Sequence, residues 1–226
     1  MSSGMLPRYT HIINPKLKHT YLSFDAEGGL VIKSPKVSQS YIETLLLKKA
    51  SWIRRSQERL AKKKGRTSLI SSDTELYFLG DAYPLELKKR ENKRISLTRT
   101  DTHFLMQYAT LDPALMQKHL DRFYKKEAEA YIPTLVQRWS KRMALVPSDI
   151  RFRKTRRQWG SCSSNNVLSF NTMLMKLPVE AIEYVVVHEL AHIEHKHHQK
   201  AFWELVKTHL PDYKARQNIL AEYTPV

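Results

Sequence analysis

The sequence has little of what marks secreted and membrane proteins. It contains a single cysteine, Cys162, which excludes an intramolecular disulfide and fits a reducing compartment. No apolar run approaches the length needed to span a bilayer. The stretch 1–7 has no apolar core of the kind that a secretory signal requires. We therefore expect a cytoplasmic protein with no membrane partner.

Negative charge is also scarce, since 22 acidic residues face 38 basic ones and the formal net charge is +16. Such an excess favours non-specific binding of nucleic acid or another polyanion, and a solubilising basic surface explains it equally well. No base-reading motif is apparent. The densest basic group precedes Trp159 and consists of Arg151, Arg153, Lys154, Arg156 and Arg157.

The hydrophobic pattern of the first half indicates an antiparallel, β-rich region with one long helix. Residues at helical spacing follow Ser38, a capping residue, and this helix has a basic face and is expected to end just before Gly65. We interpret 1–110 as an N-terminal domain. Its strand-like segments are 21–25, 30–33, 76–79, 83–87, 95–98 and 104–108, the last four as a meander.

The second half, 111–226, is expected to be a catalytic domain, so that the whole chain is of the α+β class. Asp112 and Pro113 are typical of a helix start, and Pro133 should break, kink or restart that long helix. Two strands and a buried helix that begins at Pro178 follow. The strands are expected at 150–158 and 167–174.

The helix after Pro178 carries the motif HExxH at 188–192. Residues four apart share a helix face, so His188 and His192 can aim two imidazoles at one point, an arrangement that suits Zn²⁺. Glu189 lies beside the first histidine, where it can take a proton from an activated water molecule as a general base. The apolar neighbours of these residues predict a buried site.

A tetrahedral catalytic zinc needs a third protein ligand. His198 lies ten residues after His188, the third-ligand spacing of HExxHxxGxxH, in which a sharp turn brings the last histidine back. His195 stands where that pattern has glycine, and histidine tolerates a positive φ better than most residues. His195 itself and Glu204 are alternative ligands. No methionine follows Met175, which excludes a downstream Met-turn and argues against a metzincin.

Further residues complete a recognisable pattern around this motif. They are Trp159-Gly160-Ser161-Cys162, a strand that ends near Asn171, the segment HELAH, and His198 followed by Phe202-Trp203. In this combination nearly the whole chain resembles the YgjP-like family of small HExxH metal-dependent hydrolases. The resemblance implies a minimal zincin-like domain, a small sheet plus the HExxH helix, with His188, His192 and His198 as zinc ligands and Glu189 as base. The chain departs from the family at 197–199, where Asn-His-Ser is frequent.

Substrate-binding residues are expected on the strands before the HExxH helix. An edge strand beside such a helix commonly pairs with extended substrate, and either the region of Trp159, Gly160 and Ser161 or the strand 167–172 can do so. A donor for the developing oxyanion is also needed. Arg157, Asn171 and Tyr184 are the candidates, and Asn171 can alternatively orient a zinc ligand.

The leading hypothesis is a zinc metallopeptidase that cleaves peptides or proteins, with Glu189 activating water. A metal-dependent nucleotide (UTP-type) pyrophosphatase is an alternative, although the chain lacks the paired carboxylates that Mg²⁺ chemistry on phosphates prefers. A nucleic-acid-associated protease of the SprT-like kind is another, by analogy alone. A nucleic-acid-binding module with structural zinc fits less well, because three histidines with an adjacent glutamate describe an open catalytic site.

Overall fold

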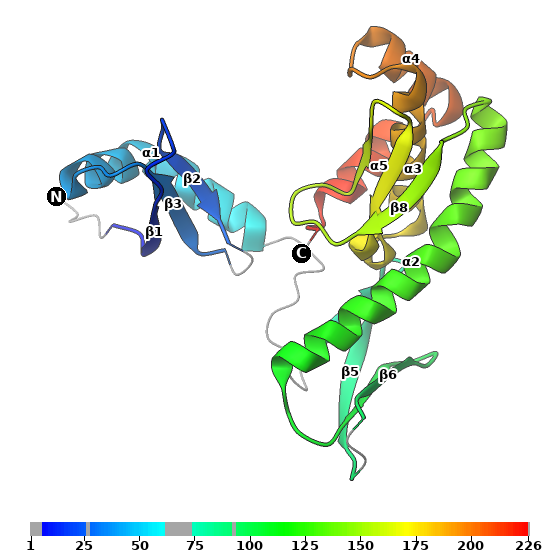
Figure 1. The fold of residues 1–226 in the computed structure, drawn as a ribbon, viewed down its shortest axis with the longest axis horizontal. Helices are drawn as coiled ribbons and strands as arrows, with labels where there is room; N and C mark the ends of the chain where they lie inside the picture. The colour runs from blue at the N-terminus through cyan, green and yellow to red at the C-terminus, as the bar shows by residue number, and fades with distance from the viewer. Residues whose placement is uncertain (1–5, 26–27, 62–73, 92–93, 226) are drawn as a thin grey trace. The chain divides into compact units, whose positions relative to one another are not determined.

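A computed structural model describes residues 6–25, 28–61, 74–91 and 94–225 (Figure 1). It combines α-helices with three β-sheets, which confirms the α+β class. The chain forms two compact units, Met1–Lys63 and Lys64–Val226. No helix in the described ranges has both the length and the apolar character to cross a membrane.

The first unit is a three-stranded sheet packed against one helix. Strands β2 (Tyr21–Phe24) and β3 (Leu30–Ser34) form the expected antiparallel hairpin, and β1 (Tyr9–Ile13) pairs in parallel with β3. The hydroxyl of Ser38 caps the helix by accepting a bond from the backbone N–H of Tyr41 at 3.2 Å; the predicted helix end near Gly65 lies outside the described residues. The helix is α1 (Gln39–Ala61). The core that it shares with the sheet is Leu30, Ile32, Ile42, Leu46 and Ile53.

The second unit contains two sheets and the remaining helices. The strands of its first sheet are β4 (Glu75–Phe78), β5 (Asp81–Lys89), β6 (Ser96–Arg99) and β7 (Phe104–Tyr108). Those of its second sheet are β8 (Asp149–Arg153), β9 (Gly160–Cys162) and β10 (Val167–Asn171). The helices are α2 (Pro113–Met143), the 3-10 helix η1 (Thr172–Lys176), α3 (Val179–Glu194), α4 (Lys200–His209) and α5 (Tyr213–Ala221).

The strand order of the first sheet is β4-β5-β7-β6, so the predicted antiparallel meander is wrong here. Strand β7 lies between β5 and β6 and runs parallel to β5. Its Phe104 and Met106 are fully buried, whereas β6, which contains few apolar residues, lies at the edge of the sheet. Burial of the most apolar strand in the middle of the sheet decides the order.

Helix α2 begins as predicted, because the Asp112 carboxylate accepts a bond from the backbone N–H of Leu115 at 3.0 Å. It does not end at Pro133, contrary to one expected outcome, but runs on to Met143. Ile132, Leu135 and Val136 beside Pro133 are buried, and their packing outweighs the hydrogen bond that proline cannot donate. The helix contacts β6 of the first sheet, β8 of the second and α3 (Figure 1).

One continuous core joins both sheets of the second unit. It includes Leu76 and Phe104 from the first sheet, Leu168 and Phe170 from the second, and Val186 of α3. The two compact units divide near residue 63, so the part of 1–110 that follows this position belongs to the second unit. Independent folding of 1–110 and 111–226 stays a prediction.

The turn between β4 and β5 is docked on the start of α3. Gly80 has a φ of +98°, and a Cβ at this position would lie 2.9 Å from the Cα of Pro178. The backbone N–H of Leu79 donates to the carbonyl of Met175 at 2.8 Å. The first sheet thus anchors the N-terminal end of the helix that carries the HExxH motif.

Replacement of Gly80 by alanine is expected to lower the free energy of unfolding by about 1–3 kcal/mol, because a side chain at positive φ is strained and meets the backbone of Pro178. Gly80→Asn should also destabilise, since asparagine tolerates positive φ but keeps the Cβ. Urea unfolding measures both. Unchanged midpoints in the two variants would mean that this close approach contributes nothing to stability.

Candidate metal centre

Three histidines converge at the C-terminal end of α3. His188 and His192 belong to the helix, and His198 lies in the segment between α3 and α4. The Nε2 atom of His198 lies 3.0 Å from Nε2 of His188 and 3.1 Å from Nε2 of His192. In the ranges that the structure describes, no other group of His, Cys, Asp or Glu side chains is arranged to hold a metal ion.

The segment after α3 turns His198 back without a positive φ. His195 caps the helix in an extended conformation, with φ −119°, so the left-handed conformation considered for it does not occur. Because the helix ends at Glu194, the side chain of His195 leaves the face of the two helical histidines and lies 3.6 Å from the Glu194 carboxylate. Neither His195 nor Glu204 belongs to the cluster.

The donor set fits a tetrahedral metal ion. Two nitrogens bound to one zinc ion at about 2.0–2.1 Å in tetrahedral geometry are about 3.3 Å apart, close to the observed 3.0 and 3.1 Å. Burial, together with the neighbouring His192 and His198, lowers the pKa of His188 to about 3, and burial lowers the pKa of His192. Both imidazoles are therefore neutral, the form that binds a metal.

Hydrogen bonds at the far side of two rings leave Nε2 free to bind. The Nδ1 atom of His192 lies 2.9 Å from the carbonyl oxygen of His195, which can only accept, so Nδ1 carries the proton. The Nδ1 atom of His188 lies 3.4 Å from the hydroxyl of Tyr184, which can accept in the same way. Tyr184, a candidate oxyanion donor by sequence, is thus placed behind a candidate ligand.

Aromatic rings pack around the three imidazoles. Phe202 of α4 is fully buried, and its ring centroid lies between 4.6 and 4.9 Å from all three imidazole rings. Trp203 stacks on His198 at 5.6 Å, and Tyr213 of α5 stacks on Trp203 at 5.5 Å. The Phe-Trp pair was part of the sequence pattern, but no sequence signal pointed to Tyr213.

The carboxylate of Glu189 lies against β9. A Cβ on Gly160 would come within 2.6 Å of its Oε1 atom, so a side chain there would collide with it. Burial raises the pKa of Glu189 to about 8, and an adjacent cation would oppose that shift. None of the described residues hydrogen-bonds to this carboxylate, which leaves both oxygens available for a proton.

The predicted substrate residues divide into two groups. Trp159, Gly160 and Ser161 line a small pocket of about 50 Å³ at the second sheet, as does Asn171. Arg157 is exposed and does not line it, whereas Arg153 does. Arg153 is the last residue of β8 and pairs in register with Asn171 of β10, whereas Arg157 lies beyond the end of that strand.

Asn171 is occupied by protein groups. Its Nδ2 lies 2.8 Å from the carbonyl oxygen of Thr155 and 3.1 Å from that of Gln158, and its Oδ1 accepts from the backbone N–H of Met173 at 3.0 Å. These bonds tie the segment before Trp159 to the end of β10. The side chain therefore supports the pocket wall.

The basic residues before Trp159 are partly paired. Arg151 donates to Asp149 at 2.9 Å, and Lys154 contacts Asp121 of α2 at 2.7 Å. Arg153 is the member of this group that reaches the small pocket. Binding of a polyanion by this surface stays a prediction.

Comparison with known proteins adds three findings. The family model described as YgjP-like, metallopeptidase domain, matches residues 18–223. No curated protein sequence matches the chain. A crystal structure of the metallopeptidase zymogen of Pyrococcus abyssi abylysin is similar over 39% of this chain and 90% of that chain, with 19% sequence identity and a TM-score of 0.37.

Proposed function

This chain belongs to the YgjP-like family of metallopeptidase domains, and on that premise we propose that it hydrolyses peptide bonds with a zinc ion held by His188, His192 and His198. The observation that carries the proposal is the convergence of three histidine Nε2 atoms beside a buried carboxylate. When bound, zinc supplies a Lewis acid and lowers the pKa of water. The remaining chemistry belongs to the side chains of this chain.

Glu189 is the proposed general base. It takes the proton that the attacking water loses and then passes a proton to the leaving amine. Its burial favours the protonated form between these two transfers, and its freedom from hydrogen bonds to the described residues leaves it able to accept.

Strand β9 is the proposed docking edge for the scissile segment. It is the last strand of its sheet, so its outer edge pairs with no strand of the described residues. An extended peptide can add to such an edge by main-chain hydrogen bonds. Gly160 then places the peptide beside Glu189, while Trp159 and Arg153 contribute the neighbouring pocket. Asn171 acts as a positioning residue.

Gly160→Ala is expected to reduce peptide hydrolysis by on the order of 10²-fold, because the added methyl group displaces the Glu189 carboxylate and misplacement by about 1 Å has an effect of that size. Zinc content should not change, since the three histidines keep their contacts. Hydrolysis of a quenched peptide library and metal analysis measure the two effects, with thermal unfolding as the control for folding. Full activity would show that Glu189 need not lie against this strand.

A substrate screen tests the proposed reaction itself. The zinc-loaded chain is incubated with the peptide library, with UTP, and with protein bound to single-stranded DNA. Peptide cleavage that disappears on chelation and returns with zinc supports the proposal. Release of pyrophosphate from UTP without peptide cleavage would overturn it in favour of nucleotide hydrolysis.

A further inference from the structure

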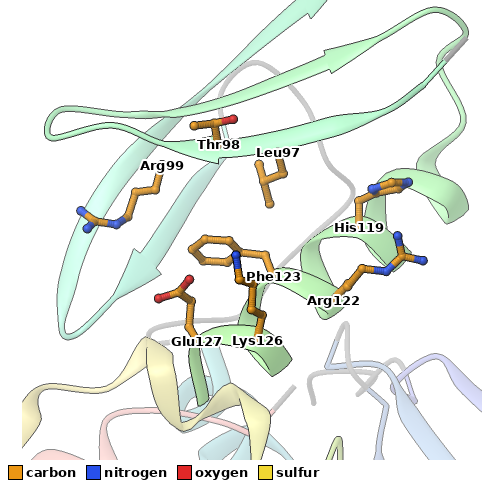
Figure 2. Close-up of a pocket in the computed structure, with 8 residues that line it drawn as sticks. All are labelled: Leu97, Thr98, Arg99, His119, Arg122, Phe123, Lys126 and Glu127. Atoms are coloured by element: carbon orange, nitrogen blue, oxygen red, sulfur yellow. The ribbon is translucent and has the colours of Figure 1, made fainter. Parts of the chain in front are cut away.

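A second pocket, of about 390 Å³, lies between β6 and the N-terminal half of α2 (Figure 2). The helix residues that line it recur at spacings of three and four and therefore share one face. The pocket lies far along α2 from the contact between α2 and α3. Arg138 ion-pairs with Glu183 of α3, and about 24 Å of helix, sixteen residues, separates Arg138 from Arg122 in the pocket. The lining comprises Leu97, Thr98 and Arg99 from β6 and His119, Arg122, Phe123, Lys126 and Glu127 from α2.

The pocket exists because the first sheet ends at β6. Leu97 and Arg99 pair in register with Met106 and Phe104, so all four side chains face α2. No further strand of the described residues continues the sheet, and the layer between sheet and helix is open at this edge. Phe123 forms an apolar floor, packed edge-on against Phe104 at 5.3 Å.

Three cations surround this apolar floor. The described residues offer neither a hydrogen bond nor an ion pair to Arg122 and Lys126. Arg99 lies over the ring of Phe78 at 4.8 Å and that of Tyr83 at 5.8 Å, which holds its guanidinium in place without a carboxylate. Glu127 is the single acid in the lining. Such a group of like charges favours an anionic ligand.

Besides burial, the positive electrostatic potential of the pocket also lowers the pKa of His119. Burial is the main cause that lowers the pKa of its imidazole, and Arg122 and Lys118 lower it further. The imidazole is therefore mainly neutral near pH 7 and serves as a polar wall. The positive charge of the pocket comes from Arg99, Arg122 and Lys126.

We propose that this groove docks an extended, acidic segment of a partner polypeptide. Figure 2 shows Arg99 and Arg122 on opposite sides of Phe123. If an apolar residue of the docked peptide packs on Phe123, acidic residues on either side of it in the peptide can each reach one of these arginines. Alternate side chains of a strand point to one face and are about 6.6 Å apart. The segment that fits has the pattern acid-x-apolar-x-acid. Its backbone pairs with the outer edge of β6 by strand addition.

The edge strand and the apolar floor favour a peptide over a phosphate group. A phosphate needs only the cations, whereas here they lie beside the outer edge of β6, which pairs with no strand of the described residues. In a peptidase the groove would recruit acidic substrates to the same unit that holds the metal centre. That consequence rests on the proposed function, while the docking itself does not.

Fluorescence anisotropy tests the docking. The protein is the full chain with Glu189→Gln, so that hydrolysis does not interfere, and the probe is a labelled nonapeptide with the pattern Glu-x-Leu-x-Glu. We expect binding that weakens as salt rises. The double variant Arg122→Gln/Lys126→Gln should weaken binding about tenfold, because charge-assisted hydrogen bonds are lost. The charge-matched control Lys125→Gln/Lys141→Gln, which alters α2 outside the lining, should change it by less than about twofold.

Four results would overturn the proposal. The first is equal affinity for a peptide in which Gln replaces every Glu, and the second is an equal loss in the two double variants. The third is unchanged affinity after N-methylation of alternate backbone amides, which would exclude pairing with β6. The fourth is displacement of the labelled peptide by inorganic phosphate or single-stranded DNA at a lower concentration than the unlabelled peptide requires. This result would assign the groove to phosphate. Binding without hydrolysis keeps the outcome separate from the test of peptidase activity.

Discussion

Glu189→Gln is expected to reduce peptide hydrolysis by about 10²–10⁴-fold, the range that a general base contributes, while zinc stays bound. Glutamine has nearly the shape of glutamate, so it fits the space beside Gly160 without moving the strand. It cannot take a proton from water at neutral pH. The three candidate ligands are unchanged, because Glu189 does not belong to their cluster. The rate constant with a cleaved peptide and the zinc content measure the two halves of this prediction.

The comparison variant for Glu189→Gln is His198→Ala. If Glu189→Gln lost its zinc while His198→Ala kept it, the roles of base and ligand would have to be exchanged. Equal hydrolysis by the wild-type protein and Glu189→Gln would remove this side chain from the mechanism.

His198→Ala is expected to weaken zinc binding by more than about 100-fold, beyond what loss of a residue behind a ligand causes. It removes the nitrogen that lies 3.0 Å from Nε2 of His188 and 3.1 Å from Nε2 of His192, and in the described residues no other His, Cys, Asp or Glu belongs to the cluster. It also removes the ring on which Trp203 stacks. Competition with a chelator of known affinity measures the effect.

Two neighbouring histidines provide matched controls. His195→Ala keeps the backbone carbonyl that accepts from His192. The side chain that it removes lies next to the Glu194 carboxylate and not in the cluster of three histidines. His197 is exposed and outside the cluster. Both variants should bind zinc within a few-fold of the wild type. The same affinity in all three alanine variants would rule out His198 as a ligand.

The convergence of the histidines was predictable because its determinants are local. The four-residue spacing of His188 and His192 follows from helix geometry, and Pro178 and the valines before the motif predicted where the helix starts and that it is buried. The position of His198 could be predicted only because its ten-residue spacing from His188 matches a known motif. The left-handed conformation considered for His195 was wrong, although His198 still lies beside the two helical histidines.

Features that depend on pairing between distant segments were not predictable in the same way. Strand spacing alone could not show that β7 inserts between β5 and β6, because the order depends on which strand buries more apolar surface. The occupied amide of Asn171 depends on bonds to a loop 13 to 16 residues away. The groove combines residues of β6 and α2, and neither segment carries a motif of its own.

The docking of the β4–β5 turn on Pro178 limits how this chain can be shortened. A fragment beginning at residue 111 would retain every proposed ligand and the proposed base. It would, however, leave α2 and η1 without the strands that cover their apolar faces, and exposed surface of that kind promotes aggregation. A sheet that contributes no side chain to the metal centre thus anchors the helix that carries two of its histidines, and we expect a deletion in that sheet to weaken metal binding.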